Sequence, residues 1–547
     1  MHVSPSGVAD NIYRRAGPGD VLEYEYLIPA DHYPGTFYYH PHFEGSSSVQ
    51  TLGGMSGVIV VEDPPGTLPV ELEAMRDVVM VIQETNVESG SLRNYKSASK
   101  IAGSKMPLYG ERPEESGEGG TEGDERSTLL HFVTINGQYQ PVLAARPGEA
   151  TRVRLVHAGN NDHMYISVQS SWRENSGEKR EAYPQADDRS QSSTAGADVK
   201  HGDGGEDEAA GSCTLLTLAR DGVYLPTPRL QGGGRGHLVL APGSRADVAL
   251  LCDRPGVYRL FSSKGGRAAE EGEGEPVMDF LGNKTDVFEG TLAFVDVRGD
   301  VMEMELPAES PGAIGESRLL RDLRDVPDSE VSRFVFEFNQ GEKVSRLGQM
   351  YTWYGVNGEE YDVESISRRV PLGGVEEWVI VNSRLGRGEG AVGCQAPLKN
   401  NATSSGEGGS GGGNRRRSLR WLLSSRELEG EGGGEKMREH DEKMREQSEA
   451  DKIKACERAG PGKKTLTGHP FHLHVNHFQV VGSSWGQKDG PDWSVGDWRD
   501  TVSVPTPGNV TVRWRADDFT GEAVAHCHIF GHSDTGMMMN FEIFAEP

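Results

Sequence analysis

Short β-rich runs recur along the whole chain, and they are rich in Val, Ile, Phe and Thr. Gly, Pro or Asp bounds most of these runs, and few stretches show the apolar spacing of a helix. Representative runs are SGVIVVED (56–63), ATRVRLVH (150–157), ADVALLC (246–252), EEWVIVN (376–382) and NVTVRWR (509–515). A long series of such runs is typical of β-sandwiches or barrels, so we expect an all-β chain with several of them in a row.

Four polar stretches interrupt this pattern. Residues 110–127, 172–212 and 263–275 are runs of Gly, Glu, Ser and Asp. Residues 385–464 combine a Gly/Ser/Arg tract with EKMREHDEKMREQSEADKIKACERAG, which has the composition of a charged helix. None of the four has enough apolar residues to build a core, so we interpret them as surface insertions in loops.

Length and charge narrow the class of protein. The chain has 547 residues, which is too long for one domain and indicates roughly three or four. Its net charge of −27 would repel both nucleic acid and anionic lipid, so neither is expected as a partner. No apolar run reaches the length of a transmembrane helix, so no membrane span is expected.

The cysteines are too few and too scattered for a disulfide scaffold. They are Cys213, Cys252, Cys394, Cys456 and Cys527. Free thiols are the favoured interpretation, and one disulfide between Cys213 and Cys252 is the alternative.

The segment HCHIFGHSDTGM (526–537) is the strongest chemical signal. A chance match to its pattern of His, Cys and Met is expected in roughly four chains per million of this composition. A blue-copper site needs two imidazoles and a thiolate around the metal, with a weak thioether on the axis. Zinc also binds Cys and His, but Met537 is a poor zinc ligand. Neighbouring side chains of a strand point to opposite faces, so His526 and His528 point away from Cys527 toward a second site.

Two further histidine segments complete the pattern. HPFHLH (469–474) places His472 and His474 on one strand face, while His469 precedes them and can turn toward Cys527. YYHPHFEG (38–45) again has two histidines spaced by two, at His40 and His42. A single H-x-H pair is a weak signal, and only the three segments together predict metal sites.

These segments resemble the multicopper oxidases, a family that includes laccases, ascorbate oxidases, bilirubin-type oxidases and cuprous oxidases. IPADHYPGTFYYHPH (28–42) and GGMSGVIVVEDP (53–64) look like the family's first domain. TINGQYQPVLAARPGEATRVRLVHAG (134–159) looks like its second domain, and DWRDTVSVPTPGNVTVRWRADDFTG (497–521) looks like its third. The resemblance covers most of the chain apart from the four insertions.

The resemblance implies three consecutive cupredoxin-like β-sandwich domains with Greek-key, plastocyanin-like topology. The first would occupy 1–70 and be incomplete. The second would occupy 71–300, with the insertions at 110–127, 172–212 and 263–275. The third would occupy 315–547, with the insertion at 385–464, and would carry a type 1 copper site.

A ligand set also follows from the resemblance, with four copper ions in a complete protein: type 1, type 2 and a binuclear type 3 pair. Type 1 copper would be held by His469, Cys527 and His532, with Met537 on the axis. The remaining ions would be held by His42, His474 and His526 (one type 3 copper), His40 and His528 (the other), and His472 (type 2).

The sequence departs from the family at its start. The family opens with an H-x-H-G motif that supplies one type 2 and one type 3 ligand, and this motif is absent here. MHVSPSGVADN resembles the segment that directly follows the motif, and His2 is not expected to be a ligand. No signal peptide is visible. We therefore expect an N-terminally truncated sequence that lacks the first strands of domain one and any signal peptide.

A second departure concerns proton delivery. Ser533 stands where the family often has an acidic residue, and the adjacent Asp534 is expected to substitute for it in part. Asp10 resembles the family carboxylate that assists proton delivery near the type 2 copper. An Asp before Asn is also an ordinary turn former.

The resemblance implies an extracytoplasmic or secreted oxidoreductase that couples one-electron oxidation of a donor to four-electron reduction of O₂ to water. The donor would be a phenol, an aromatic amine or a metal ion, and Cys527 would pass electrons through His526 and His528. One alternative is a copper-binding protein without oxidase activity, because the first ligand motif is missing. The other is a nitrite-reductase-like or electron-transfer cupredoxin, which the histidines beside Cys527 disfavour.

Overall fold

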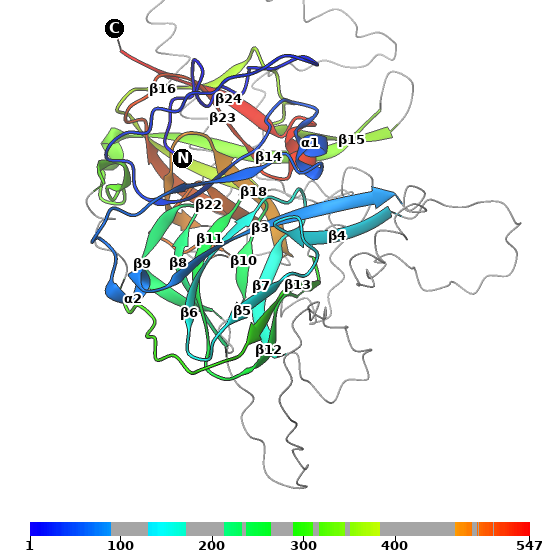
Figure 1. The fold of residues 1–547 in the computed structure, drawn as a ribbon. Helices are drawn as coiled ribbons and strands as arrows, with labels where there is room; N and C mark the ends of the chain where they lie inside the picture. Colours follow the sequence, from blue (N-terminus) through cyan, green and yellow to red (C-terminus); the bar gives the residue numbers. More distant parts are fainter. Residues whose placement is uncertain are drawn as a thin grey trace, which may run out of the picture.

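The computed structural model describes residues 1–88, 129–170, 213–231, 237–263, 288–309, 317–344, 350–382, 465–483, 490, 492–506 and 508–546. Strands dominate these residues, and the prediction of an all-β chain is confirmed (Figure 1). The four predicted insertions lie outside the described residues, apart from Ser263. None of the described helices is long and apolar enough to cross a membrane.

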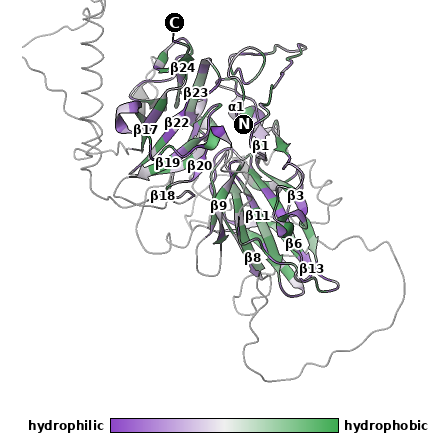
Figure 2. Ribbon diagram, turned by 90° about the vertical axis from the view of Figure 1, so that its left-hand side faces the viewer, coloured by the Kyte–Doolittle hydropathy of each residue, from purple (hydrophilic) through white to green (hydrophobic). Residues whose placement is uncertain are grey.

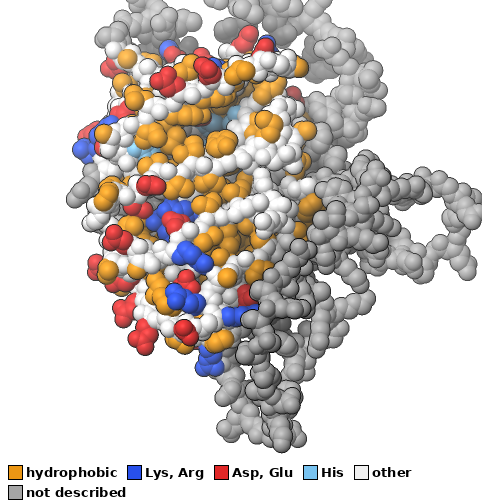
Figure 3. Space-filling view, viewed as in Figure 1, with side chains coloured by type: hydrophobic (Ala, Val, Ile, Leu, Met, Phe, Trp, Pro, Cys, Tyr) orange, Lys and Arg blue, Asp and Glu red, His pale blue; other side chains and the backbone are white. Residues whose placement is uncertain are grey.

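The N-terminal segment forms a two-stranded antiparallel sheet. The two strands are β1 (Gly35–Tyr39) and β2 (Gly57–Val61), with the short helix α1 (Ser47–Leu52) between them and α2 (Val70–Glu73) after them. Tyr33 and Phe37 pack with Val223, Leu319 and Leu320, which attaches the segment to the rest of the protein. Among the described residues, most of the exposed large hydrophobic side chains lie between residues 8 and 70. The face of the molecule drawn in Figure 3 has hydrophobic side chains over much of its surface.

The next part of the chain is a β-sandwich. One sheet has the order β4-β3-β6-β11-β8-β9 and the other has the order β10-β7-β12-β13-β5. The six strands of the first sheet are β3 (Arg76–Glu88), β4 (Leu129–Ile135), β6 (Ala150–His157), β8 (Cys213–Arg220), β9 (Val223–Gln231) and β11 (Arg245–Cys252). The five strands of the second are β5 (Val142–Ala145), β7 (Met164–Ser170), β10 (Leu238–Leu240), β12 (Gly256–Ser262) and β13 (Gly290–Val297).

A second β-sandwich follows, with sheet orders β15-β14-β17-β22-β19-β20 and β16-β24-β23-β18-β21. Its first sheet consists of β14 (Val331–Val344), β15 (Met350–Val356), β17 (Val375–Asn382), β19 (Phe478–Ser483), β20 (Trp498–Arg499) and β22 (Gly508–Arg515). Its second sheet consists of β16 (Ile366–Pro371), β18 (Thr465–Leu473), β21 (Thr501–Thr506), β23 (Gly521–Cys527) and β24 (Met538–Phe544). Short helices η3 (Arg318–Leu320), η4 (Asp328–Glu330) and α5 (Phe530–Ser533) lie in its loops.

The two sandwiches repeat one topology. In each six-stranded sheet, the strand that comes first along the chain pairs in parallel with one neighbour, β3 with β6 and β14 with β17. On its other side it pairs antiparallel with the next strand along the chain, β3 with β4 and β14 with β15. Each sandwich encloses its own apolar core, the second around the fully buried Trp378 and Trp514. Figure 2 shows the two sandwiches as separate lobes, with β1 and α1 near the junction between them.

A disulfide joins two strands of the first sandwich. Cys213 and Cys252 lie opposite one another where β8 pairs with β11, and their Cα atoms are 4.0 Å apart. The expectation of free thiols is therefore wrong for this pair, because the register of two strands distant in sequence brings them together. Cys527 is a free, buried thiol, as expected, and Cys394 and Cys456 lie outside the described residues.

Replacing both Cys213 and Cys252 with serine is expected to lower the free energy of unfolding by about 3–4 kcal/mol. The bond closes a loop of 39 residues, and its loss restores that conformational entropy to the unfolded chain. Urea unfolding monitored by far-ultraviolet circular dichroism, which reports on the strands of both sandwiches, measures the change. An unchanged midpoint would show that the bond does not restrict the unfolded state.

Candidate metal centre

A cysteine and two histidines converge inside the second sandwich, and we call them the thiolate site: His469, Cys527 and His532. Cys527 Sγ lies 3.5 Å from His469 Nδ1 and 3.7 Å from His532 Nδ1, and the two Nδ1 atoms are 3.2 Å apart. All three side chains are buried. One ion of ordinary size can contact all three atoms at once, and two imidazoles with a thiolate suit copper.

Local backbone structure builds the thiolate site. Cys527 ends β23, and its N–H donates to Met537 O, while Met537 N–H donates to His532 O. The chain therefore folds back through α5 and brings Met537 beside the strand that carries Cys527, inside the same apolar core. Gly536 makes the turn possible, because its φ is +117° and a Cβ there would meet Tyr354 O at 2.6 Å. Tyr354 stacks on His532, with ring centroids 4.2 Å apart.

Burial keeps the metal-free thiolate site uncharged. It lowers the pKa of His469 to about 3 and the pKa of His532 well below its ordinary value, so both imidazoles are neutral. Burial also raises the pKa of the Cys527 thiol above its ordinary value. The thiol therefore keeps its proton until a metal displaces it.

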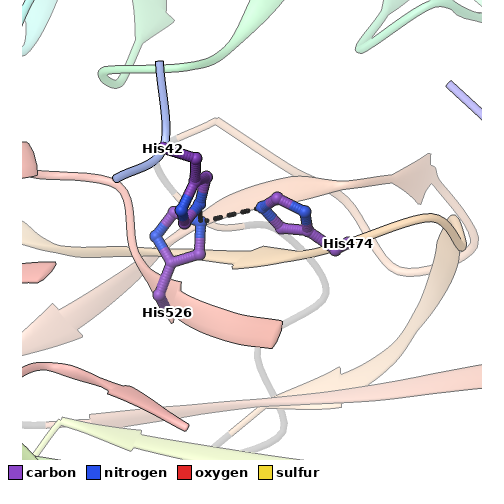
Figure 4. Close-up of side chains that lie close together, drawn as sticks. All are labelled: His42, His474 and His526. Carbon is purple, nitrogen blue, oxygen red and sulfur yellow. Dashed lines mark hydrogen bonds between the residues drawn. The ribbon is translucent and has the colours of Figure 1, made fainter. Parts of the chain in front are cut away.

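Three more histidines form a second cluster, the three-imidazole site: His42, His474 and His526 (Figure 4). His526 Nε2 lies 3.1 Å from His42 Nε2 and 3.2 Å from His474 Nε2. His42 comes from the loop after β1, His474 follows β18, and His526 is in β23. Residues far apart in sequence thus meet between the N-terminal segment and the second sandwich.

Hydrogen bonds at the far side of two of these rings decide where their protons are. His526 Nδ1 lies 2.9 Å from Cys527 O, and His474 Nδ1 lies 3.1 Å from an Asp10 carboxylate oxygen. Both oxygens accept, so each Nδ1 carries the proton and each Nε2 carries a lone pair. Two lone pairs 3.2 Å apart repel one another unless a cation lies between them. The three-imidazole site therefore fits a metal ion.

Three remaining predicted ligands, His40, His472 and His528, lie beside this cluster. His528 is 5.0 Å from His472 and 5.3 Å from His40 between ring centroids. His472 Nδ1 donates to Asp500 O at 2.8 Å, and His40 Nδ1 donates to Pro41 O at 3.0 Å, which leaves both Nε2 atoms as lone-pair donors. Among the described residues, the buried His528 Nδ1 has no hydrogen-bond partner. These rings can hold further metal at the same junction.

The alternation of strand β23 separates the two sites. Cys527 faces the thiolate site, whereas His526 belongs to the three-imidazole site. The ring centroid of His528 lies 5.4 Å from that of His526. All ten side chains proposed as metal ligands from the sequence are thus gathered at these two places.

Asp10, Asp534 and Ser533 lie near the histidines and form different hydrogen bonds. Burial alone would raise the pKa of Asp10, but its hydrogen bond with His474 lowers it to about 2. The Asp534 carboxylate accepts from the backbone N–H groups of Gly45 and Ser48, so it ties the loop after His42 to the loop after His532. Ser533 Oγ donates to Phe530 O.

Three residues that contact these histidines or support them were not predicted from the sequence. Tyr38 OH lies 2.8 Å from His528 Nε2, Asp500 accepts from His472, and Arg245 pairs with Asp500. Tyr38 is two residues before His40, and strand alternation could have placed it on the ligand face. Arg245 lies outside every motif quoted above. Asp500 lies within the 497–521 stretch, where no chemical role was predicted for it, and the two residues come from different sandwiches.

Known proteins resemble this chain most clearly at its C-terminal end. The family model described as multicopper oxidase matches residues 458–546, a range that contains HPFHLH and HCHIFGHSDTGM. Laccase-6 of Oryza sativa subsp. japonica is 38% identical over 89 residues, which are 15% of each chain. Laccase-11 of Arabidopsis thaliana is 40% identical over 85 residues, 14% of this chain and 15% of the relative. The matched stretch thus spans about 15% of these relatives.

A solved structure shares the fold over a much greater length. The laccase from Pediococcus acidilactici Pa5930 superposes with a TM-score of 0.51 at 15% sequence identity. The superposition covers 99% of this chain and 77% of that laccase. Both sandwiches and the N-terminal segment therefore have counterparts in that fold.

Proposed function

We propose that this chain is a member of the multicopper oxidase family and that it couples one-electron oxidation of a donor to four-electron reduction of O₂ to water. The observation that carries the proposal is the pairing of a buried Cys/His/His site with a histidine cluster through one strand, β23. The donor is proposed to be a phenol, an aromatic amine or a metal ion.

We assign the thiolate site to type 1 copper, which His469, Cys527 and His532 would hold, with Met537 as a weaker fourth ligand. The three-imidazole site is assigned to one type 3 copper. The other assignments are His40 and His528 to the second type 3 copper and His472 to type 2 copper. When bound, copper supplies the one-electron exchange with the donor and the reduction of oxygen.

The protein's own residues contribute geometry, connection and exclusion of water. Cys527 is bonded to His526 and His528 through the backbone, so the two sites are joined by a few covalent bonds. Burial of the thiolate site keeps water from competing for its ligands. Asp10 orients His474 through its hydrogen bond and places an ionised carboxylate beside the cluster, where we propose that it assists proton delivery.

The disulfide supports a location outside the cytosol. Bonds such as Cys213–Cys252 form and persist mainly in oxidising compartments. We therefore propose that the protein is secreted or otherwise extracytoplasmic.

Copper loading of the purified 547-residue chain tests the proposal. A blue protein with an intense thiolate-to-copper absorption band is expected, because the thiolate site provides the ligands of a type 1 centre. An oxygen electrode with a phenolic donor then tests catalysis. A blue protein that consumes no oxygen would be a copper-binding relative without oxidase activity, and a colourless protein would overturn the type 1 assignment.

Copper uptake by the thiolate site is expected to strengthen with pH, by about tenfold per unit while the thiol is protonated. Burial raises the pKa of Cys527, so the thiol is protonated before copper binds. Burial also lowers the pKa of His469 to about 3 and that of His532 well below its ordinary value, so both imidazoles are neutral. Copper therefore displaces one proton, and only that from the thiol. A pH-stat titration should record one proton per blue copper. A Cys527→Ser variant should release none there, and pH-independent uptake would contradict this account.

A further inference from the structure

Arg245 of strand β11 is a buried cation at the junction of the two sandwiches and the N-terminal segment. Its guanidinium binds the Asp500 carboxylate with two hydrogen bonds, Nη1 to Oδ1 at 2.8 Å and Nη2 to Oδ2 at 2.5 Å. Both side chains are almost fully shielded from solvent. The pair links the first sandwich, which supplies none of the assigned copper ligands, to the sandwich that supplies most of them.

Asp500 in turn orients His472. The Asp500 carbonyl oxygen accepts from His472 Nδ1 at 2.8 Å, and Thr501 Oγ1 lies 3.0 Å from the same nitrogen. A carbonyl cannot donate, so Nδ1 must carry the proton and Nε2 must present its lone pair. Because Arg245 holds the Asp500 side chain, it also fixes the backbone that selects this tautomer.

The same guanidinium supports the ring of His528. Arg245 Nη1 donates to Gly243 O at 2.8 Å. Gly243 has a φ of +83°, and a Cβ there would lie 2.6 Å from three atoms of the His528 ring. Gly243 therefore packs directly against that imidazole, and the hydrogen bond from Arg245 holds the Gly243 backbone in place.

A third contact reaches the strand that leads to His40 and His42. Arg245 lies over the Tyr38 ring, 5.7 Å from its centroid, and its Nε donates to Thr36 O at 3.4 Å. Tyr38 OH lies 2.8 Å from His528 Nε2. One side chain thus contacts the neighbours of histidines from three separate chain segments.

We infer that Arg245 is a positioning residue that sets the geometry of the histidine cluster from the first sandwich, which contributes no ligand itself. The planar guanidinium suits this role because it donates in several fixed directions at once, whereas a lysine ammonium cannot reproduce the bidentate pairing. The assignment of the cluster to copper rests on the proposed function. The effect of Arg245 on the hydrogen bonding of His472 is independent of the proposed function.

Arg220 provides the matched control. It is also a buried arginine of the first sandwich, and it also crosses to the second by donating to Asp492 O as well as to Val239 O. None of its described contacts involves a histidine of the cluster. If Arg245 only stabilises the junction, replacing either arginine should have the same consequences.

The first test uses copper-free protein labelled with ¹⁵N-histidine, with His472 assigned by a His472→Gln variant. The wild type and Arg220→Met should show His472 protonated on Nδ1. Arg245→Met should shift that ring toward a mixture of tautomers. An unchanged His472 spectrum in folded Arg245→Met would overturn the inference.

The second test measures bound copper that is not blue, by total copper content minus type 1 copper. Arg245→Met should lower the affinity for this copper by about 10–100-fold, as loss of residues that orient metal ligands commonly does, with the blue band retained. Arg245→Lys should recover only part of that loss, and Arg220→Met should match the wild type. Equal copper in all variants would overturn the inference, whereas a colourless wild type would overturn the proposed function instead.

Should Arg245→Met fail to fold, Asp500→Asn makes the same test. This variant keeps the size of the side chain and the backbone carbonyl but removes the charge that binds the guanidinium. The same changes in the His472 spectrum and in non-blue copper are expected. Wild-type behaviour of folded Asp500→Asn would overturn the inference.

Discussion

A Cys527→Ser variant is expected to lose the blue absorption completely while keeping its fold. The serine hydroxyl does not ionise at accessible pH and is a poor ligand for copper beside two imidazoles, so the charge-transfer band has no donor. Cys527 is fully buried in the core of the second sandwich, and a buried hydroxyl costs about 1–3 kcal/mol of stability. Absorption spectra of copper-loaded protein give the first result, and far-ultraviolet circular dichroism gives the second.

The Cys213→Ser/Cys252→Ser variant is the control for loss of sulfur elsewhere in the chain. It removes two cysteines without touching the thiolate site, so its blue band should match the wild type. Blue absorption retained by Cys527→Ser would refute the assignment of this cysteine as the ligand. Oxygen uptake should also stop in Cys527→Ser, because the donor then has no entry point.

The local pattern of the sequence was enough to anticipate much of the site. Alternation along β23 predicted that His526 and His528 would face away from Cys527, and the spacing of HPFHLH predicted the division of its histidines. Both predictions depend only on strand geometry within a few residues. The same holds for the fold class, since the runs of β-branched and aromatic residues are local signals.

Long-range pairing limited the rest. The Cys213–Cys252 bond depends on the register of β8 against β11, and the partnership of Arg245 with Asp500 depends on how two sandwiches pack. Neither register nor packing leaves a fixed spacing in the sequence. The contacts of Asp534 show the same limit, because its carboxylate accepts from the backbone N–H groups of Gly45 and Ser48, which are distant in the sequence.

A His474→Ala variant should lose copper from the three-imidazole site and keep the blue band. His474 Nε2 is one of three donors there, and its Nδ1 is held by Asp10, so the mutation removes both a ligand and its orienting hydrogen bond. Affinity for this copper should fall by about 10–100-fold. The thiolate site should be unaffected, because none of its three donors contacts His474 among the described interactions.

Copper content and electron paramagnetic resonance separate these outcomes for His474→Ala. His157→Ala is the control, since His157 is also buried and its ring bonds to Asp162 O and Gly159 N, not to a ligand atom of either site. With a donor present, His474→Ala should still bleach but should recover its colour in air more slowly than the wild type. If the variant instead loses the blue band and keeps its other copper, then HPFHLH is divided between the two sites in the opposite way, with His474 serving the thiolate and His469 the cluster.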